Sequence, residues 1–215
     1  MTPIFIPPKE VLSYAKGLVQ VYKEREFEIE EIYPDLADLL QLPLRRGATS
    51  LDRKVGETLH SVGIERVRLE RDGRFYLRVR EPSQLGTSDL EAPLVAEGLR
   101  KLATIYVLVK NGVLRRGNFL FWDEPEVNIN PSVTKLLINL IGAFSSEGIQ
   151  VWVATHDYFV LKYADMLLKE KKFFSLFWGK EGVEAETGDS IYSLNHNDIL
   201  NEFEEIYRVE FQRDV

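Results

Sequence analysis

NFLFWDEPEVNINP, residues 118–131, places four large apolar residues directly before two adjacent acids, Asp123 and Glu124. A continuous apolar run of this kind is typical of a strand in a parallel sheet that helices cover on both faces. In such sheets, ligands bind beyond the carboxyl ends of the strands. The stretch therefore predicts a buried parallel strand that presents two carboxylates at a binding edge.

A second apolar run, residues 149–157, follows a helical pattern over residues 131–148 and ends in Thr155, His156 and Asp157. A further helix over 158–172, a third strand over 173–179, a polar turn over 180–190 and a last helix after Asn195 complete the pattern. Alternating strands and helices indicate an α/β fold with a parallel sheet and flanking helices. Two neighbouring strands would then present Asp, Glu and His at one edge.

The first part of the chain has a different pattern. Helical periodicity covers residues 9–26, 33–42, 50–62 and 94–114, and residues 80–93 predict a polar loop. Two alternating runs flank Asp72-Gly73, which predicts a β-hairpin over about residues 64–80. We therefore expect a helical region with an inserted hairpin over 1–90 and an α/β core over 91–215.

The hairpin carries a basic face, which fits either a solvated surface or a nucleic-acid contact. Its arginines are Arg66, Arg68, Arg71, Arg74, Arg78 and Arg80.

Composition narrows the function classes. The formal net charge of −7 disfavours a wholly electropositive nucleic-acid binder. The chain has no cysteine, so it forms no disulfide and no thiolate metal site, as expected in a reducing cytoplasm. No apolar run approaches about 18 residues, and the first residues lack the pattern of a signal peptide, so we expect no membrane span.

Several segments together resemble known motifs. Residues 119–131 resemble the Walker B and D-loop segment of ABC-type ATPases, and residues 151–170 resemble their switch-histidine segment. PLVAEGLRKLATIYVL, residues 93–108, lies upstream at the place of the ABC signature helix. The chain is thus similar to ABC-type and AAA-like ATPases of the prokaryotic branch that includes the SMC and OLD proteins. Members of this branch are often encoded in phage-defence and toxin–antitoxin-like systems.

The resemblance implies roles for individual residues. Asp123 would hold Mg²⁺ through water, Glu124 would be the catalytic carboxylate, and His156 would contact the γ-phosphate of ATP. Arg100 and Lys101 would supply positive charge to the phosphates. The signature loop would comprise Ala96, Glu97 and Gly98, and the D-loop, which crosses to a partner subunit, would comprise Asn128, Ile129, Asn130 and Pro131.

The family binds triphosphate with a P-loop, G-x-x-x-x-G-K-[ST], and this sequence contains none. Backbone amides and the lysine of that loop provide most of the grip on the phosphates. We therefore expect the chain to be the C-terminal portion of an ATPase. It would bind ATP and Mg²⁺ well only when a missing N-terminal part or a partner chain supplies the P-loop. The expected partner is a second copy in a homodimer or a P-loop-containing chain.

Two other functions stay open. The first is a P-loop-free, inactive dimerisation or regulatory module, because the signature helix and the D-loop are intermolecular surfaces in the family that the chain resembles. Ala96 and Glu97 also replace the serine and first glycine of that family's signature. A metal-dependent nuclease would use Asp123, Glu124 and Asp157. The other two histidines, His60 and His196, lack a motif and are interpreted as structural or surface residues.

Overall fold

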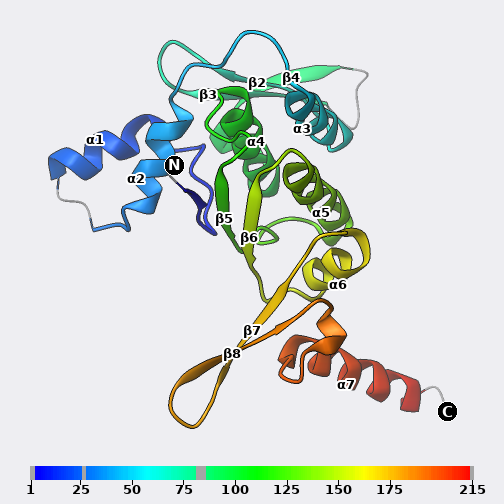
Figure 1. Ribbon diagram of the computed structural model, residues 1–215. Coiled ribbons are helices and arrows are strands. Elements are labelled where there is room, and N and C mark those ends of the chain that lie inside the picture. Colours follow the sequence, from blue (N-terminus) through cyan, green and yellow to red (C-terminus); the bar gives the residue numbers. More distant parts are fainter. Residues whose placement is uncertain (1–2, 26–27, 81–85, 214–215) are drawn as a thin grey trace. The chain divides into compact units, whose positions relative to one another are not determined.

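The computed structural model describes residues 3–25, 28–80 and 86–213 (Figure 1). The chain forms two compact units, Met1–Ala154 and Thr155–Val215, and each is described by itself. The functional division predicted near residue 90 falls inside the first unit and stays a prediction.

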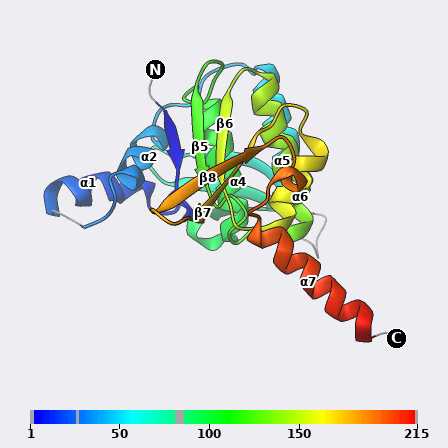
Figure 2. The same ribbon diagram turned by 60° about the horizontal axis from the view of Figure 1, so that its bottom comes forward.

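The first unit is built on a three-stranded parallel sheet with the order β1-β5-β6 (Figures 1 and 2). Its strands are β1 (Ile4–Ile6), β5 (Phe119–Asp123) and β6 (Gln150–Ala154). Helix α5 (Pro131–Ser146) connects β5 to β6, as a parallel pair requires. The predicted parallel pair is confirmed, and the short N-terminal apolar segment adds a third strand to it.

The two faces of this sheet differ. Ile4, Ile6, Leu120 and Trp122 point to one face and are at most 5% exposed. On the other face, Phe5 lies beside Phe121, which lies beside Trp152. We call Phe5, Phe119, Phe121 and Trp152 the aromatic face, because their side chains alternate with the buried set. Phe5 and Phe119 are each 38% exposed, so this face is only partly covered within the chain.

Helix α4 (Glu97–Lys110) supplies much of the core. Leu102, Ile105 and Leu108 are at most 1% exposed, and they recur at helical spacing. Helix α3 (Ser50–Ser61) packs against α4, α5 and the hairpin strand β2, and α2 (Ile32–Leu40) packs against β1 and α4. Helix α1 (Ala15–Arg25) packs mainly on α2.

A second, antiparallel sheet contains the predicted hairpin, with β2 (Ile64–Leu69) and β3 (Phe75–Arg80). A third strand, β4 (Thr87–Glu91), pairs with β3, so the loop predicted over residues 80–93 is wrong for this part. Residues 81–85 of that loop lie outside the described ranges. A 3₁₀ helix, η1 (Ala92–Leu94), joins β4 to α4.

Strand β4 also changes the charge of the hairpin. Arg78 donates to Asp89 at 2.8 Å, which lowers the pKa of the Asp89 carboxyl, and Arg74 lies 3.2 Å from Glu91. Arg68 pairs with both Glu70 and Asp89. The basic face is therefore largely neutralised by cross-strand acids, and any nucleic-acid contact there would have to compete with these pairs.

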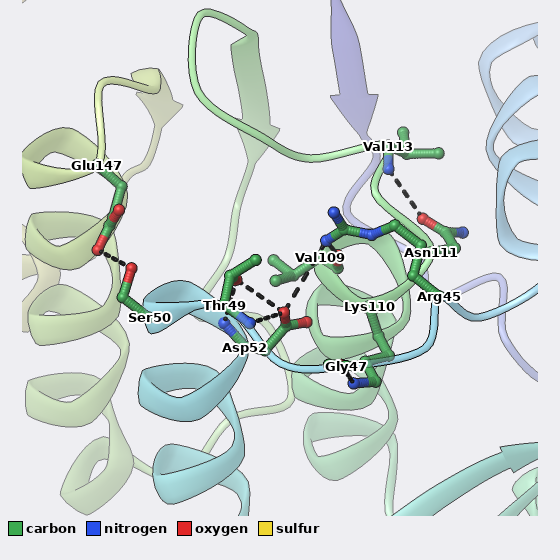
Figure 3. A network of polar contacts seen from close by, with 10 residues as sticks. All are labelled: Arg45, Gly47, Thr49, Ser50, Asp52, Val109, Lys110, Asn111, Val113 and Glu147. Carbon is green, nitrogen blue, oxygen red and sulfur yellow. Dashed lines mark hydrogen bonds and ion pairs between the residues drawn. The ribbon is translucent and has the colours of Figure 1, made fainter.

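Polar contacts fasten α3 to the C-terminal end of α4 (Figure 3). Thr49 and Asp52 form a reciprocal capping box at the start of α3, with the Thr49 amide donating to Asp52 at 2.6 Å. Arg45 lies 3.9 Å from Asp52 and donates to the carbonyl of Val109 in the last turn of α4. A cation at this end of a helix is favourable because the last carbonyls carry partial negative charge.

Substituting Asp52 with alanine should lower the free energy of unfolding by about 1–2 kcal/mol, because the cap of α3 and the neighbour of Arg45 are lost together. Urea denaturation followed by circular dichroism measures this change. Ser50→Ala is the matched control, since it removes only an exposed bond to Glu147. Equal losses in the two variants would contradict the assigned role of Asp52.

The second unit contains α6 (Tyr158–Leu167), the strands β7 (Phe173–Trp178) and β8 (Val183–Gly188), the 3₁₀ helix η2 (Ile191–Ser193) and α7 (Asp198–Arg213). Strand β7 was predicted as a third parallel strand, but it pairs antiparallel with β8. The polar turn predicted over residues 180–190 is therefore mostly the second strand of a hairpin. No helix in the described part of the chain is long and apolar enough to cross a bilayer.

Candidate functional site

Asp123 and Glu124 lie at the carboxyl end of β5, the central strand of the parallel sheet. Asp123 is the last residue in register with β6, and the Glu124 amide donates to the Ala154 carbonyl at 2.9 Å. Glu124 has a φ of +42°, a conformation that is uncommon without glycine. The chain therefore leaves the sheet abruptly at Glu124, which is where a binding edge was predicted.

The loop after β5, residues 124–130, holds a second unusual backbone. Asn128 has a φ of +63°. Backbone bonds from Val127 to Glu124 and from Ile129 to Glu126 stabilise the loop. Such strain costs about 1–3 kcal/mol per residue and clusters at functional sites, so the loop is a candidate on backbone geometry as well as on sequence.

Alternation along β5 puts Asp123 on the same face of the sheet as Phe119 and Phe121. Both Asp123 and Glu124 are partly exposed, so neither carboxylate is sealed in the core. Burial raises the pKa of the Tyr33 phenol on α2, and the charges of Glu30 and then Asp123 raise it further. Tyr33 was not predicted as a site residue, because its sequence carries no signal that it lies near the strand end.

Lys101 is a buried cation that contacts the loop after β5. It is only 3% exposed, and its Nζ donates to the Glu124 carbonyl oxygen at 3.3 Å. Burial lowers the pKa of Lys101, and Glu97, Glu126, Glu124 and Asp123 partly offset that effect. The structure thus places Lys101 against the backbone of the catalytic candidate; a direct bond to a phosphate stays a prediction.

At Gly98 the signature-like segment contacts the predicted D-loop. A Cβ atom at Gly98 would lie 2.5 Å from the Asn128 carbonyl oxygen, which is closer than real Cβ contacts come. The start of α4 therefore packs directly on the loop at residue 128 of the same chain. Ala96 is the N-cap of α4 and Glu97 lies in its first turn; among the described residues, no side chain caps this end.

Arg100 is engaged elsewhere. Its Nε lies 2.9 Å from Oε1 of the buried Glu10, and its Nη1 donates to carbonyls of η1 and of Val95. The predicted role of Arg100 toward phosphate is untested, and it would compete with Glu10. Glu10 was not predicted as a partner of Arg100, because it lies in a segment with no recognisable motif.

The remaining D-loop residues begin α5. The side chain of Asn130 accepts a bond from the Ser132 amide at 3.0 Å, so Asn130 is the N-cap, and Pro131 takes the first helical position. Asn128 and Asn130 are exposed and Ile129 is half-buried. This part of the loop is accessible, as a contact with another subunit would need.

His156 is the second residue of the second unit and is exposed; its action at the carboxylates stays a prediction. Asp157 caps α6 by accepting a bond from the Val160 amide at 2.8 Å. His196 pairs with Glu186 at 3.0 Å, and His60 contacts Arg80 at 3.2 Å, in keeping with structural roles.

The carboxylates at the end of β5 suit a Mg²⁺ ion that is bound by few protein ligands. Within the described ranges, no group of three or more His, Asp or Glu side chains could hold a metal ion by itself. Mg²⁺ usually keeps several waters and takes one or two carboxylates plus phosphate oxygens. The half-exposed Asp123 fits that mode, with the remaining positions left to water and a nucleotide.

Comparisons with solved structures show the fold. One SMC ATPase structure, from work on ATP-driven dimerization and DNA-stimulated activation, aligns with a TM-score of 0.52 and 15% identity, covering 74% of this chain and 91% of that one. The Smc head domain with a coiled coil and joint from Pyrococcus yayanosii aligns with a TM-score of 0.50 and 16% identity over 89% of this chain. This chain spans only 34% of the length of the latter.

No curated protein matches the sequence. A family model described as "AAA domain, putative AbiEii toxin, Type IV TA system" matches residues 8–162, which is most of the chain. That range includes the α4 start, the tip of β5, the loop at 124–130 and His156. The chain therefore belongs to this AAA-domain family of ATPase-like, nucleotide-binding modules.

Proposed function

We propose that this chain contributes the Mg²⁺-binding and catalytic carboxylates of an ABC-type ATPase whose P-loop comes from a preceding segment or a partner chain. The observation that carries this proposal is the placement of Asp123 and Glu124 at the carboxyl end of the central parallel strand, on a strained loop fastened to α4. Family membership and the likeness to SMC ATPase heads support it.

In this proposal the two acids have different tasks because they leave β5 in different directions. Asp123 would hold Mg²⁺ through water, and the metal would supply positive charge that neutralises the phosphates. Glu124 orients and deprotonates the water that attacks the γ-phosphate, with His156 contacting that phosphate. Lys101 offsets the negative charge that two adjacent carboxylates would otherwise set against a triphosphate.

The aromatic face suits the docking of the P-loop part. Parallel sheets are normally covered on both faces, yet Phe5 and Phe119 are each 38% exposed here. Asp123 points to this same face. A P-loop segment that covers the aromatic face would bring its phosphate-binding amides to the side of the sheet on which the proposed magnesium ligand lies.

The contact of Gly98 with Asn128 supports a coupled role for the signature-like and D-loop segments. We infer that Ala96 to Gly98 and Asn128 to Pro131 form one continuous surface toward a partner subunit, in a homodimer or with a P-loop-bearing chain. A role in phage defence or in a DNA-related process is part of this proposal. The family description itself names a toxin–antitoxin system and neither phage nor DNA.

ATP turnover tests the proposal. The chain is assayed alone and together with a chain that carries the P-loop, at saturating Mg²⁺. We expect little turnover alone and clear turnover in the mixture. Glu124→Gln should lower it by about 10²-fold or more while ATP binding persists, because only the proton-accepting group is changed.

Glu91→Gln, an acid on β4 paired with Arg74, is the matched control and should leave turnover unchanged. If every P-loop assembly lacks Glu124-dependent turnover but still forms a stable complex, the alternative of an inactive dimerisation or regulatory module is favoured instead.

A further inference from the structure

Helix α7 in the second unit exposes an unusual number of large apolar side chains. Phe211 is 65% exposed, Tyr207 58% and Ile206 52%, all within one 16-residue helix. Single exposed apolar residues are normal, but a contiguous apolar stripe on a helix commonly marks an interaction surface. Neither the family motifs nor the proposed ATPase chemistry uses this helix.

The exposed stripe borders a groove. A depression of about 470 Å³ lies between α7 and the side chains of Tyr158 and Tyr192. Tyr158 and Phe203, which both line the groove, stack with their ring centroids 3.6 Å apart. Tyr207 and Phe211 also line the groove while remaining largely exposed. The same two side chains are thus both part of a groove wall and available as apolar anchors.

Charges on α7 favour one occupant. Glu204 and Arg208 line the groove, one helical turn apart and equally far from Ile206 in the sequence. Residues 204, 207, 208 and 211 share one face of α7. When two copies of this face pair antiparallel about a twofold axis level with residue 206, residue 204 of one lies opposite residue 208 of the other. Each copy's Glu204 then lies opposite the Arg208 of the other copy, so two equivalent ion pairs form. Within the single chain, Arg208 pairs with the exposed Glu205, 3.2 Å away, which is a weak contact.

We propose that α7 is a self-association surface, on which a second copy of this chain docks its α7 antiparallel. Tyr207 and Phe211 of each copy fill the groove of the other, and two reciprocal pairs between Glu204 and Arg208 set the register. This interface lies in the second unit and needs no nucleotide. It is therefore separate from the signature and D-loop surface of the proposed ATPase.

Sedimentation equilibrium without nucleotide tests this proposal across a range of protein concentrations. We expect the apparent mass to rise from the monomer value of 24.8 kDa toward twice that value. Glu204→Arg alone and Arg208→Glu alone should each weaken self-association by about tenfold or more, because like charges meet twice in each homodimer. Mixing the two variants should restore a dimer, since both pairs are then of opposite sign.

The double variant E204R/R208E should also dimerise, because the reversed pairs are again complementary. Phe211→Ser should weaken association, whereas Leu176→Ser, which removes a side chain on β7 that is 72% exposed, should not. Circular dichroism confirms that each variant is folded. A wild-type chain that stays monomeric at about 100 µM, or a dimer that neither reversal weakens, would overturn the proposal. Neither result bears on ATP turnover.

Discussion

Replacing Glu10 with alanine is expected to destabilise the chain by about 3–5 kcal/mol, because it leaves the guanidinium of Arg100 without its acid partner. The Glu10 side chain is fully buried, and that of Arg100 is only 13% exposed. Glu10 also accepts a bond from the Ser13 amide at 3.2 Å. Chemical denaturation followed by tryptophan fluorescence measures the loss.

The contact is an ion pair and not an aligned hydrogen bond. Among the described atoms, neither Glu10 Oε1 nor Arg100 Nε has a hydrogen-bond partner, although they lie 2.9 Å apart. The pair is therefore a weak source of net stability, and removing both charges should be tolerated. The double variant Glu10→Leu with Arg100→Met should recover most of the loss.

Asp38→Ala, which breaks an exposed pair with Lys23, is the control and should have little effect. If Glu10→Ala unfolds no more easily than Asp38→Ala, then Arg100 finds another partner and is not confined to the role described here.

Adding a single methyl group at Gly98 is expected to cost about 1–3 kcal/mol in the free energy of unfolding. The new Cβ would lie 2.5 Å from the Asn128 carbonyl oxygen and 3.2 Å from the Ile129 Cα, both backbone atoms that cannot rotate away. Either α4 or the loop at 124–130 has to shift. Under the proposed function, Gly98→Ala should therefore also impair ATP turnover in the P-loop assembly.

Gly56→Ala is the matched control for Gly98→Ala. Gly56 lies inside α3, and an added Cβ would meet nothing within 4 Å. Alanine is the better helix former, so this variant should gain about 0.5–1 kcal/mol. Thermal unfolding should therefore show a lower melting temperature for Gly98→Ala and a higher one for Gly56→Ala. Equal changes would show that helix propensity, and not contact with Asn128, decides the effect at Gly98.

The strands and helices that could be predicted are those whose own residues carry a hydrophobic pattern of the matching period. Strands β5 and β6, and the helices α3 to α5, have apolar patterns that no alternative structure fits as well. Pairing partners are a tertiary property. For that reason β4 was predicted as a loop, and β7 was assigned to the parallel sheet instead of to a hairpin with β8. In both cases the strand that the prediction missed, β4 or β8, is polar, so it has no hydrophobic pattern from which it could be predicted.

The two acids of the candidate site could be predicted from the sequence, but the residues that surround them could not. Asp123 and Glu124 carry a motif, and the structure places them at a strand end as expected. The role of a lysine depends on how deeply it is buried, and residue type alone does not predict burial. Lys101 and Arg100 are neighbours in sequence, yet one lies under the loop and the other faces Glu10.

Because Lys101 is buried, the rate at which its amine is chemically modified can be used to measure local opening of the structure. An amine that is 3% exposed reacts with an acylating reagent only while the structure around it is open. Its labelling rate, followed by mass spectrometry, would therefore report how often the loop at 124–130 separates from α4. A nucleotide or a partner chain that stabilises this loop would slow the labelling of Lys101, while exposed amines such as Lys23 would continue to react.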